Sequence, residues 1–161
     1  MRVGMKILSE RRRCAVTTAL VLSNNFIRKT LNEEIPLSPM KLQKMIYFAY
    51  RDYLQQTGNQ IFSEPFSAWK YGPVVESVYY QFNAFGAKSI TKFYRDSIGD
   101  VRSISESGTI GDIINAIWRE YKLFDGIRLS QITHREGTAW HKAWISSVPY
   151  LEDEDIRNER T

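Results

Sequence analysis

Apolar residues recur at three- and four-residue intervals in several stretches of the chain, the spacing of one buried face of an α-helix. The clearest stretch follows Ser38 and Pro39, which are a good N-cap and a favoured first helical residue, and it ends at Gly58. It predicts a central core helix with a buried stripe of Leu42, Met45, Ile46, Ala49 and Tyr53. A looser pattern of the same kind predicts a first helix over residues 13–31.

The pattern changes after Gly58. Residues 61–71 alternate in the manner of a strand, and Pro65 suits a strand at a sheet edge. Gly72-Pro73 signals a turn, and Pro73 then opens a helix that ends at Gly86.

Helical patterns return in the second half of the chain, after a polar loop over residues 95–112 that has room for a short strand pair. Thr109 and Asp112 resemble a capping box ahead of a helix that runs to Tyr121. Residues 128–147 predict two short helices separated by a turn at Gly137. Trp140 and Trp144 lie on one face of the second of these helices.

These elements predict a mainly α fold, a compact helical single domain with a short β-hairpin or edge-strand element in the middle. The length of 161 residues agrees with one domain. We expect a basic N-terminal arm over residues 1–13, the helical domain over residues 14–150 and a solvated acidic tail over residues 151–161.

Charge is unevenly distributed. The formal net charge is +4, and residues 1–13 alone hold five basic side chains against one glutamate, so the arm accounts for the whole excess. Such an arm contacts phosphates weakly, but no basic stripe is spread over the predicted fold. Nucleic acid is therefore an unfavoured partner.

The few cysteines and histidines limit the chemistry. The single cysteine, Cys14, excludes an internal disulfide and a cysteine-based metal cluster, and two histidines make a zinc site unexpected. A reduced, cytoplasmic compartment fits best. No apolar run is long enough to span a bilayer, and the N-terminal segment lacks the small-residue cleavage site of a signal peptide.

A search for catalytic sets returns weak candidates. Ser130 lies four residues before His134, on one helix face, but no activating neighbour accompanies the pair. The simpler interpretation is that His134 ends a helix, where the helix dipole favours it. Cys14 beside three arginines is better explained as an ordinary helical cysteine, and no phosphate-binding glycine loop is present. We predict no catalytic residue, no metal and no cofactor.

Nucleic-acid binding is the alternative function. A helical domain with a hairpin can act as a winged helix, whose reading helix presents polar side chains to a groove. The helix after Ser38 offers Lys41, Gln43, Lys44 and Arg51, which also suit an ordinary solvated face.

Two separated blocks carry a resemblance to a known family. The first spans residues 37–86 and includes "KLQK" at Lys41–Lys44 and "AWKYGPVV" at Ala68–Val75; the second is "LSQITHREGTAW" at Leu129–Trp140. Together they resemble the Panacea domain family, also called the SocA-like family of phage- and toxin-associated proteins. The family commonly has proline before the tryptophan of the second block, where this chain has Ala139.

The resemblance implies a mainly helical fold without known catalysis. It implies an antitoxin that binds a protein toxin, usually encoded nearby, and neutralises it by direct contact. A second route that it implies is an adaptor role, in which the antitoxin hands the toxin to a cellular protease.

The stretch "SAWKYGPVVESVY" is the most informative part of the first block. We interpret it as a rigid corner with a contact surface on its outer side, because Gly72 gives backbone freedom and Pro73 restricts it. Trp69, Gly72 and Pro73 are expected to be scaffold, and Lys70 and Tyr71 to be the exposed candidates for partner contact. In the second block, Thr133 and His134 are expected to hold the C-terminal helices together by hydrogen bonds, and Trp140 matches the motif.

Overall fold

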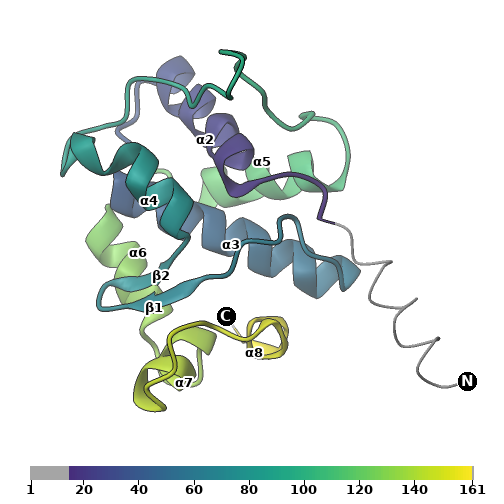
Figure 1. The fold of residues 1–161 in the computed structure, drawn as a ribbon, viewed down its shortest axis with the longest axis vertical. Helices are drawn as coiled ribbons and strands as arrows, with labels where there is room; N and C mark the ends of the chain where they lie inside the picture. Colours follow the sequence, from purple (N-terminus) through teal and green to yellow (C-terminus); the bar gives the residue numbers. More distant parts are fainter. Residues whose placement is uncertain (1–14, 161) are drawn as a thin grey trace, which may run out of the picture.

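A single helix forms the centre of the molecule. The computed structural model describes residues 15–160, and in it α3 (Pro39–Thr57) runs through the middle of the fold (Figure 1). Helices α2 (Ala19–Glu33), α4 (Glu76–Phe82), α5 (Thr109–Tyr121), α6 (Gly126–Thr133) and α8 (Asp153–Asn158) all pack against it, as does strand β2 (Gly72–Val74). The predicted fold class, mainly α with a short hairpin, is confirmed.

Local signals set both ends of α3. The Ser38 hydroxyl accepts a hydrogen bond from the Lys41 amide at 3.2 Å, Pro39 is the first residue, and Gly58 ends the helix with φ of 72°. The prediction of this helix is confirmed. Its burial is wider than one stripe, since every residue from 41 to 51 is buried.

Helix α2 begins later than predicted. Thr18 is its N-cap, and the amides of Val16 and Thr17 instead donate to the Ile61 carbonyl at 2.9 and 3.0 Å. A start at residue 13 is therefore wrong for residues 15–18, because this tertiary pairing takes the backbone out of the helix. Cys14 and the basic arm lie outside the described residues.

The central corner is a two-stranded hairpin. Strand β1 (Ser67–Trp69) pairs antiparallel with β2, with Trp69 opposite Gly72. The turn is therefore at Lys70-Tyr71, and the predicted turn at Gly72-Pro73 is wrong. Pro73 lies in β2 and does not open α4, whose N-cap is Val75. A two-stranded sheet is all edge, so it tolerates a proline.

The segment after α4 is a short 3-10 helix, η1 (Asn83–Phe85), followed by a loop over residues 86–108. No strand forms in this part of the described chain, so the expected strand pair is absent. Two buried α2 side chains hold the loop instead. The Asn24 amide hydrogen-bonds to the backbone of Tyr94 and Arg102, and the Asn25 amide hydrogen-bonds to both the N–H and the carbonyl of Ile104, all at 2.8–2.9 Å. These side-chain amides take the place of a strand partner for the partly buried backbone groups of the loop.

Helix α5 is confirmed, but its predicted cap is not. Gly108 is the N-cap and Thr109 is already helical, so Thr109 and Asp112 do not form a capping box. Helices α6 and α7 (Ala139–Ile145) are the two predicted short helices. Their N-caps are Asp125 and Thr138, whose oxygens accept backbone amide hydrogens at 2.8 and 3.1 Å.

The acidic end of the chain is packed onto the body. Helix α8 forms there, Leu151 and Ile156 are buried in the core, and Glu159 is 7% exposed. The Glu159 carboxylate accepts from the Tyr47 hydroxyl at 2.7 Å and the Ala139 amide at 2.9 Å, and lies 3.3 Å from Arg51. The expectation of a solvated tail is therefore wrong for this segment, since two apolar residues and one shared carboxylate anchor it.

Candidate functional site

The two sequence blocks meet at the hairpin. Side chains from α3, α6 and α7 all lie against residues 69–75. Between them they bond the backbone at Trp69, Tyr71, Pro73 and Val75. The corner is thus held through its main chain, which leaves its outer side chains free for contact.

The α3 side is polar and buried. The Gln43 amide pairs with both backbone groups of Val75, accepting from its N–H at 2.9 Å and donating to its carbonyl at 3.0 Å. This pairing holds the first turn of α4 at a fixed point. The Lys44 ammonium donates to the Pro73 carbonyl at 3.1 Å, and burial lowers the pKa of Lys44 to about 7.

The second block contributes further hydrogen bonds to the hairpin. The Ser130 hydroxyl donates to the Tyr71 carbonyl, and the Trp140 indole N–H donates to the Trp69 carbonyl at 2.7 Å. Neutral hydrogen bonds of this kind contribute on the order of 1 kcal/mol each, and losing one leaves a partly buried carbonyl without its protein partner.

Gly72 is required by close approach as well as by conformation. Its φ of 111° lies in a region that L-residues rarely adopt. A methyl carbon placed on Gly72 would lie 2.6 Å from Thr133 Oγ1 and 2.8 Å from Lys44 Cε. Thr133 is buried, and its hydroxyl donates to the Ser130 carbonyl at 2.7 Å. The glycine therefore lets β2 lie directly against α3 and α6.

His134 belongs to a stack of rings. It is the C-cap of α6, and its ring centre lies 3.9 Å from that of Trp140 with an interplanar angle of 22°. The Trp140 and Trp144 ring centres are in turn 5.2 Å apart. Its Nε2 is buried with no hydrogen-bond partner among the described residues. Burial, and secondly the charge of Lys44, lower the pKa of His134. The His134 side chain therefore acts through ring packing on Trp140, and the expected hydrogen bonds from the His134 and Thr133 side chains to another C-terminal helix are not found among residues 15–160.

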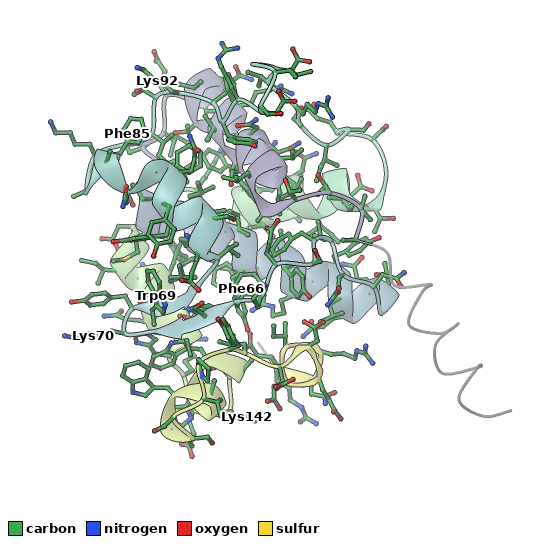
Figure 2. The ribbon with its side chains drawn as sticks, in the orientation of Figure 1. Phe66, Trp69, Lys70, Phe85, Lys92 and Lys142 are labelled. Carbon is green, nitrogen blue, oxygen red and sulfur yellow. The ribbon has the colours of Figure 1, made fainter. Side chains whose placement is uncertain are left out.

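The outer face of the hairpin is aromatic. Figure 2 shows Lys70 at the hairpin tip, pointing away from the body, and Trp69 beside it. The Tyr71 side chain is 57% exposed, and Tyr79 of α4 meets Trp69 edge to face at 4.8 Å. A cavity of about 290 Å³, which we call the hairpin pocket, opens on this face; Met40, Lys44, Trp69, Tyr71 and Tyr79 are among its lining residues.

The predicted site residues are thus brought together. Trp69, Gly72, Pro73, Thr133 and Trp140 lie in the hairpin or directly against it, Lys70 and Tyr71 form its exposed turn, and His134 packs on Trp140. Which of these residues contact a partner stays a prediction.

Other chemistries find less support in the geometry. The Ser130 hydroxyl donates its hydrogen to the Tyr71 carbonyl and is not paired with His134. In residues 15–160, no group of three or more metal-binding side chains is placed to hold an ion. None of the helices in the described part of the chain combines the length and apolar character that crossing a bilayer requires.

The groove-reading interpretation of α3 is wrong. Its proposed reading residues are 1–5% exposed and bonded or packed inside the protein; they are Lys41, Gln43, Lys44 and Arg51. Helix α3 is surrounded by other elements over residues 41–51, so these four side chains are not available to read a groove.

Gln43 and Lys44 are functional residues of the scaffold that pattern analysis missed. Polar residues on a helix normally indicate a solvated face. The signal that could have distinguished them is their place inside the "KLQK" motif of the first block, because a solvated face does not explain why these residues form part of a motif.

Comparison with known proteins agrees with this geometry. Residues 42–141 match the family described as Antitoxin SocA-like, Panacea domain, and this range contains the residues of α3, α6 and α7 that bond the hairpin. The chain belongs to this family. It is 31% identical over 127 residues to Antitoxin SocA of Caulobacter vibrioides (strain NA1000 / CB15N), covering 76% of this chain and 68% of that protein. No solved structure matches the chain significantly.

Proposed function

We propose that this chain is an antitoxin domain that neutralises a protein toxin by direct, stoichiometric contact, and that the hairpin face makes the contact. The observation that carries the proposal is the combination of a rigid hairpin backbone with an exposed aromatic pocket. Trp69, Tyr71 and Tyr79 line this pocket, and side chains of these types dominate binding hot spots.

Rigidity matters for this role. Because Gln43, Lys44, Ser130 and Trp140 hold the corner's backbone, the main chain that carries Trp69 and Tyr71 loses little freedom when a partner binds. The exposed Lys70 at the tip, 5.5 Å from the Tyr71 ring, adds a charge that favours an acidic group on the partner.

The partner that we propose is the product of a gene beside this one, met in the cytoplasm. Two routes to neutralisation remain in the proposal: occlusion of the toxin's working surface, or delivery of the toxin to a protease. They differ in the fate of the toxin, since occlusion leaves its level unchanged and delivery lowers it.

The test is affinity between the purified chain and the neighbouring gene product. Tyr71→Ala and Tyr79→Ala are each expected to weaken the complex by about 2 kcal/mol, roughly thirtyfold. Tyr150→Ala is the matched control, because Tyr150 is 46% exposed and does not line the pocket. If the complex tolerates both pocket variants as well as it tolerates the control, the contact lies elsewhere. If the two purified proteins form no complex, direct contact is rejected.

A further inference from the structure

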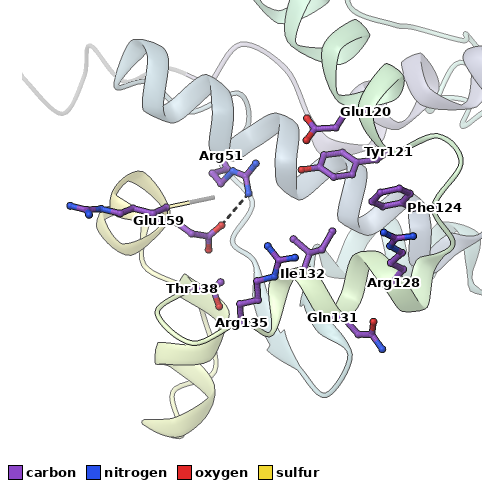
Figure 3. A pocket seen from close by; sticks show the side chains of 11 residues that line it. Arg51, Glu120, Tyr121, Phe124, Arg128, Gln131, Ile132, Arg135, Thr138 and Glu159 are labelled. Carbon is purple, nitrogen blue, oxygen red and sulfur yellow. Dashed lines mark hydrogen bonds and ion pairs between the residues drawn. The ribbon is translucent and has the colours of Figure 1, made fainter.

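A second cavity lies away from the hairpin pocket. It has a volume of about 600 Å³ and is bordered by α3, α5, α6 and the end of the chain, as Figure 3 shows. The two cavities share no lining residue. Four arginines line this one: Arg51, Arg128, Arg135 and Arg160. We call it the arginine pocket.

Its positive charge is only partly balanced. Arg51 is buried and lies 3.0 Å from Asp52 and 3.3 Å from Glu159, so it is matched by two carboxylates. Arg128, Arg135 and Arg160 are exposed, and no ion pair within residues 15–160 includes them. The Glu159 carboxylate is already bonded within the fold, which leaves Glu120 as the remaining carboxylate of the lining.

The arginines are arranged beside ring surface. The Arg128 guanidinium lies 4.0 Å from the centre of the Phe124 ring, and Tyr121 and Ile132 extend the apolar wall. Figure 3 shows Arg135 extending from the α6 side into the space below Tyr121. The pocket therefore presents free planar donors next to a flat surface on which a ring can stack.

This combination selects a ligand class. Guanidinium groups bind phosphate through two parallel hydrogen bonds, which an ammonium cannot do. A volume of about 600 Å³ is within the usual range of small-molecule pockets, roughly 300–1,000 Å³, and exceeds what a lone phosphate needs. A peptide carboxylate matches the charge but makes no use of the aromatic wall.

We propose that the arginine pocket binds a small phosphorylated molecule of nucleotide size. Its phosphate groups lie against Arg135 and Arg160, and its ring packs on the surface formed by Arg128 and Phe124. This site goes beyond toxin binding, and its occupancy is independent of whether the hairpin face contacts a toxin.

Calorimetric titration of the full chain with ADP at low salt tests the site, because exposed charges are screened at high salt. ADP is expected to bind, adenosine and inorganic phosphate to bind more weakly, and a tetraglutamate peptide to bind more weakly still. Arg135→Ala should reduce ADP affinity about tenfold or more, because it removes hydrogen bonds to the charged phosphates. Arg128→Ala should also weaken ADP binding, because it removes part of the surface on which the ring packs.

Arg119→Ala is the matched control. Arg119 is exposed on α5 and does not line the pocket, so this variant removes the same charge and should keep ADP affinity. Circular dichroism verifies that each variant is folded. Absence of ADP binding, equal ADP affinity in wild type and Arg135→Ala, or tighter binding of tetraglutamate than of ADP would each overturn the proposal. The last result would assign the pocket to an acidic protein segment.

Discussion

Replacement of Gly72 by alanine tests the close packing at the hairpin. Two separate costs are expected. The φ of 111° costs an alanine about 1–3 kcal/mol in backbone strain. The added methyl group, 2.6 Å from Thr133 Oγ1, costs about 1–3 kcal/mol more through overpacking. The contact with Lys44 Cε at 2.8 Å adds little, because a lysine stem can move. The total loss in the free energy of unfolding is about 2–6 kcal/mol.

Two further variants separate these costs. Gly58 has a φ of 72° and no atom within 4 Å of an added methyl group, so Gly58→Ala measures conformational strain alone, about 1–2 kcal/mol. Thr133→Ala removes the atom that Gly72→Ala meets. The double variant Gly72→Ala/Thr133→Ala should therefore be more stable than the sum of the single effects predicts, by about 1–2 kcal/mol.

The assay is urea unfolding followed by tryptophan fluorescence and circular dichroism, with stabilities extrapolated to water. The reasoning is refuted if Gly72→Ala costs no more than Gly58→Ala. It is also refuted if the two effects at Gly72 and Thr133 simply add, since additivity would mean that the two positions do not touch.

Three other variants test buried polar groups by the same unfolding assay. Lys44 has a folded-state pKa of about 7 against an ordinary value of 10.5, so between these pH values the unfolded chain binds a proton at Lys44 that the folded chain lacks. The stability of wild type relative to Lys44→Met should therefore rise by up to about 1.4 kcal/mol per pH unit from pH 7 towards 10.5. A difference that does not change with pH would contradict the burial of Lys44. Because burial also lowers the pKa of His134, acidification through about pH 6.5 should destabilise wild type more than His134→Phe, which keeps the stack on Trp140; parallel pH curves would remove this role. Glu159→Ala should cost about 3–5 kcal/mol by leaving Arg51 short of a buried partner, whereas Glu154→Ala on the exposed side of α8 should be nearly neutral, and equal losses would show that the carboxylate is not an anchor.

The central helix could be predicted from sequence because its signals are local. Ser38, Pro39 and Gly58 act on their own neighbouring backbone, so reading them needs no knowledge of the fold. The short helices α6 and α7 were predictable for the same reason, from apolar spacing and a glycine turn between them.

The hairpin turn was misplaced because its decisive contacts are distant in sequence. Gly72-Pro73 is a strong local turn signal, but Gln43 binds Val75 across 32 positions, and Gly72 serves to let Thr133 approach. The acidic composition of residues 151–161 led to a wrong prediction for a similar reason. Composition there predicts a solvated tail, whereas Glu159 meets Tyr47 across 112 positions.

The outer side of the candidate site was partly predictable. Exposure of Lys70 and Tyr71 follows from their place in the motif, and the structure adds Tyr79 and Met40 as further lining of the hairpin pocket. The arginine pocket had no sequence signal, since its arginines come from α3, α6 and two segments beyond helix ends.

Growth rescue tests the central claim most directly. The neighbouring gene product is expressed alone, with this chain, and with the double variant Tyr71→Ala/Tyr79→Ala, and the complex is recovered from the same cells. The account predicts toxicity alone, rescue and a stable complex with wild type, and loss of both with a folded double variant. A neighbouring product that is not toxic, that wild type fails to neutralise, or that the double variant neutralises fully would contradict neutralisation through the hairpin face.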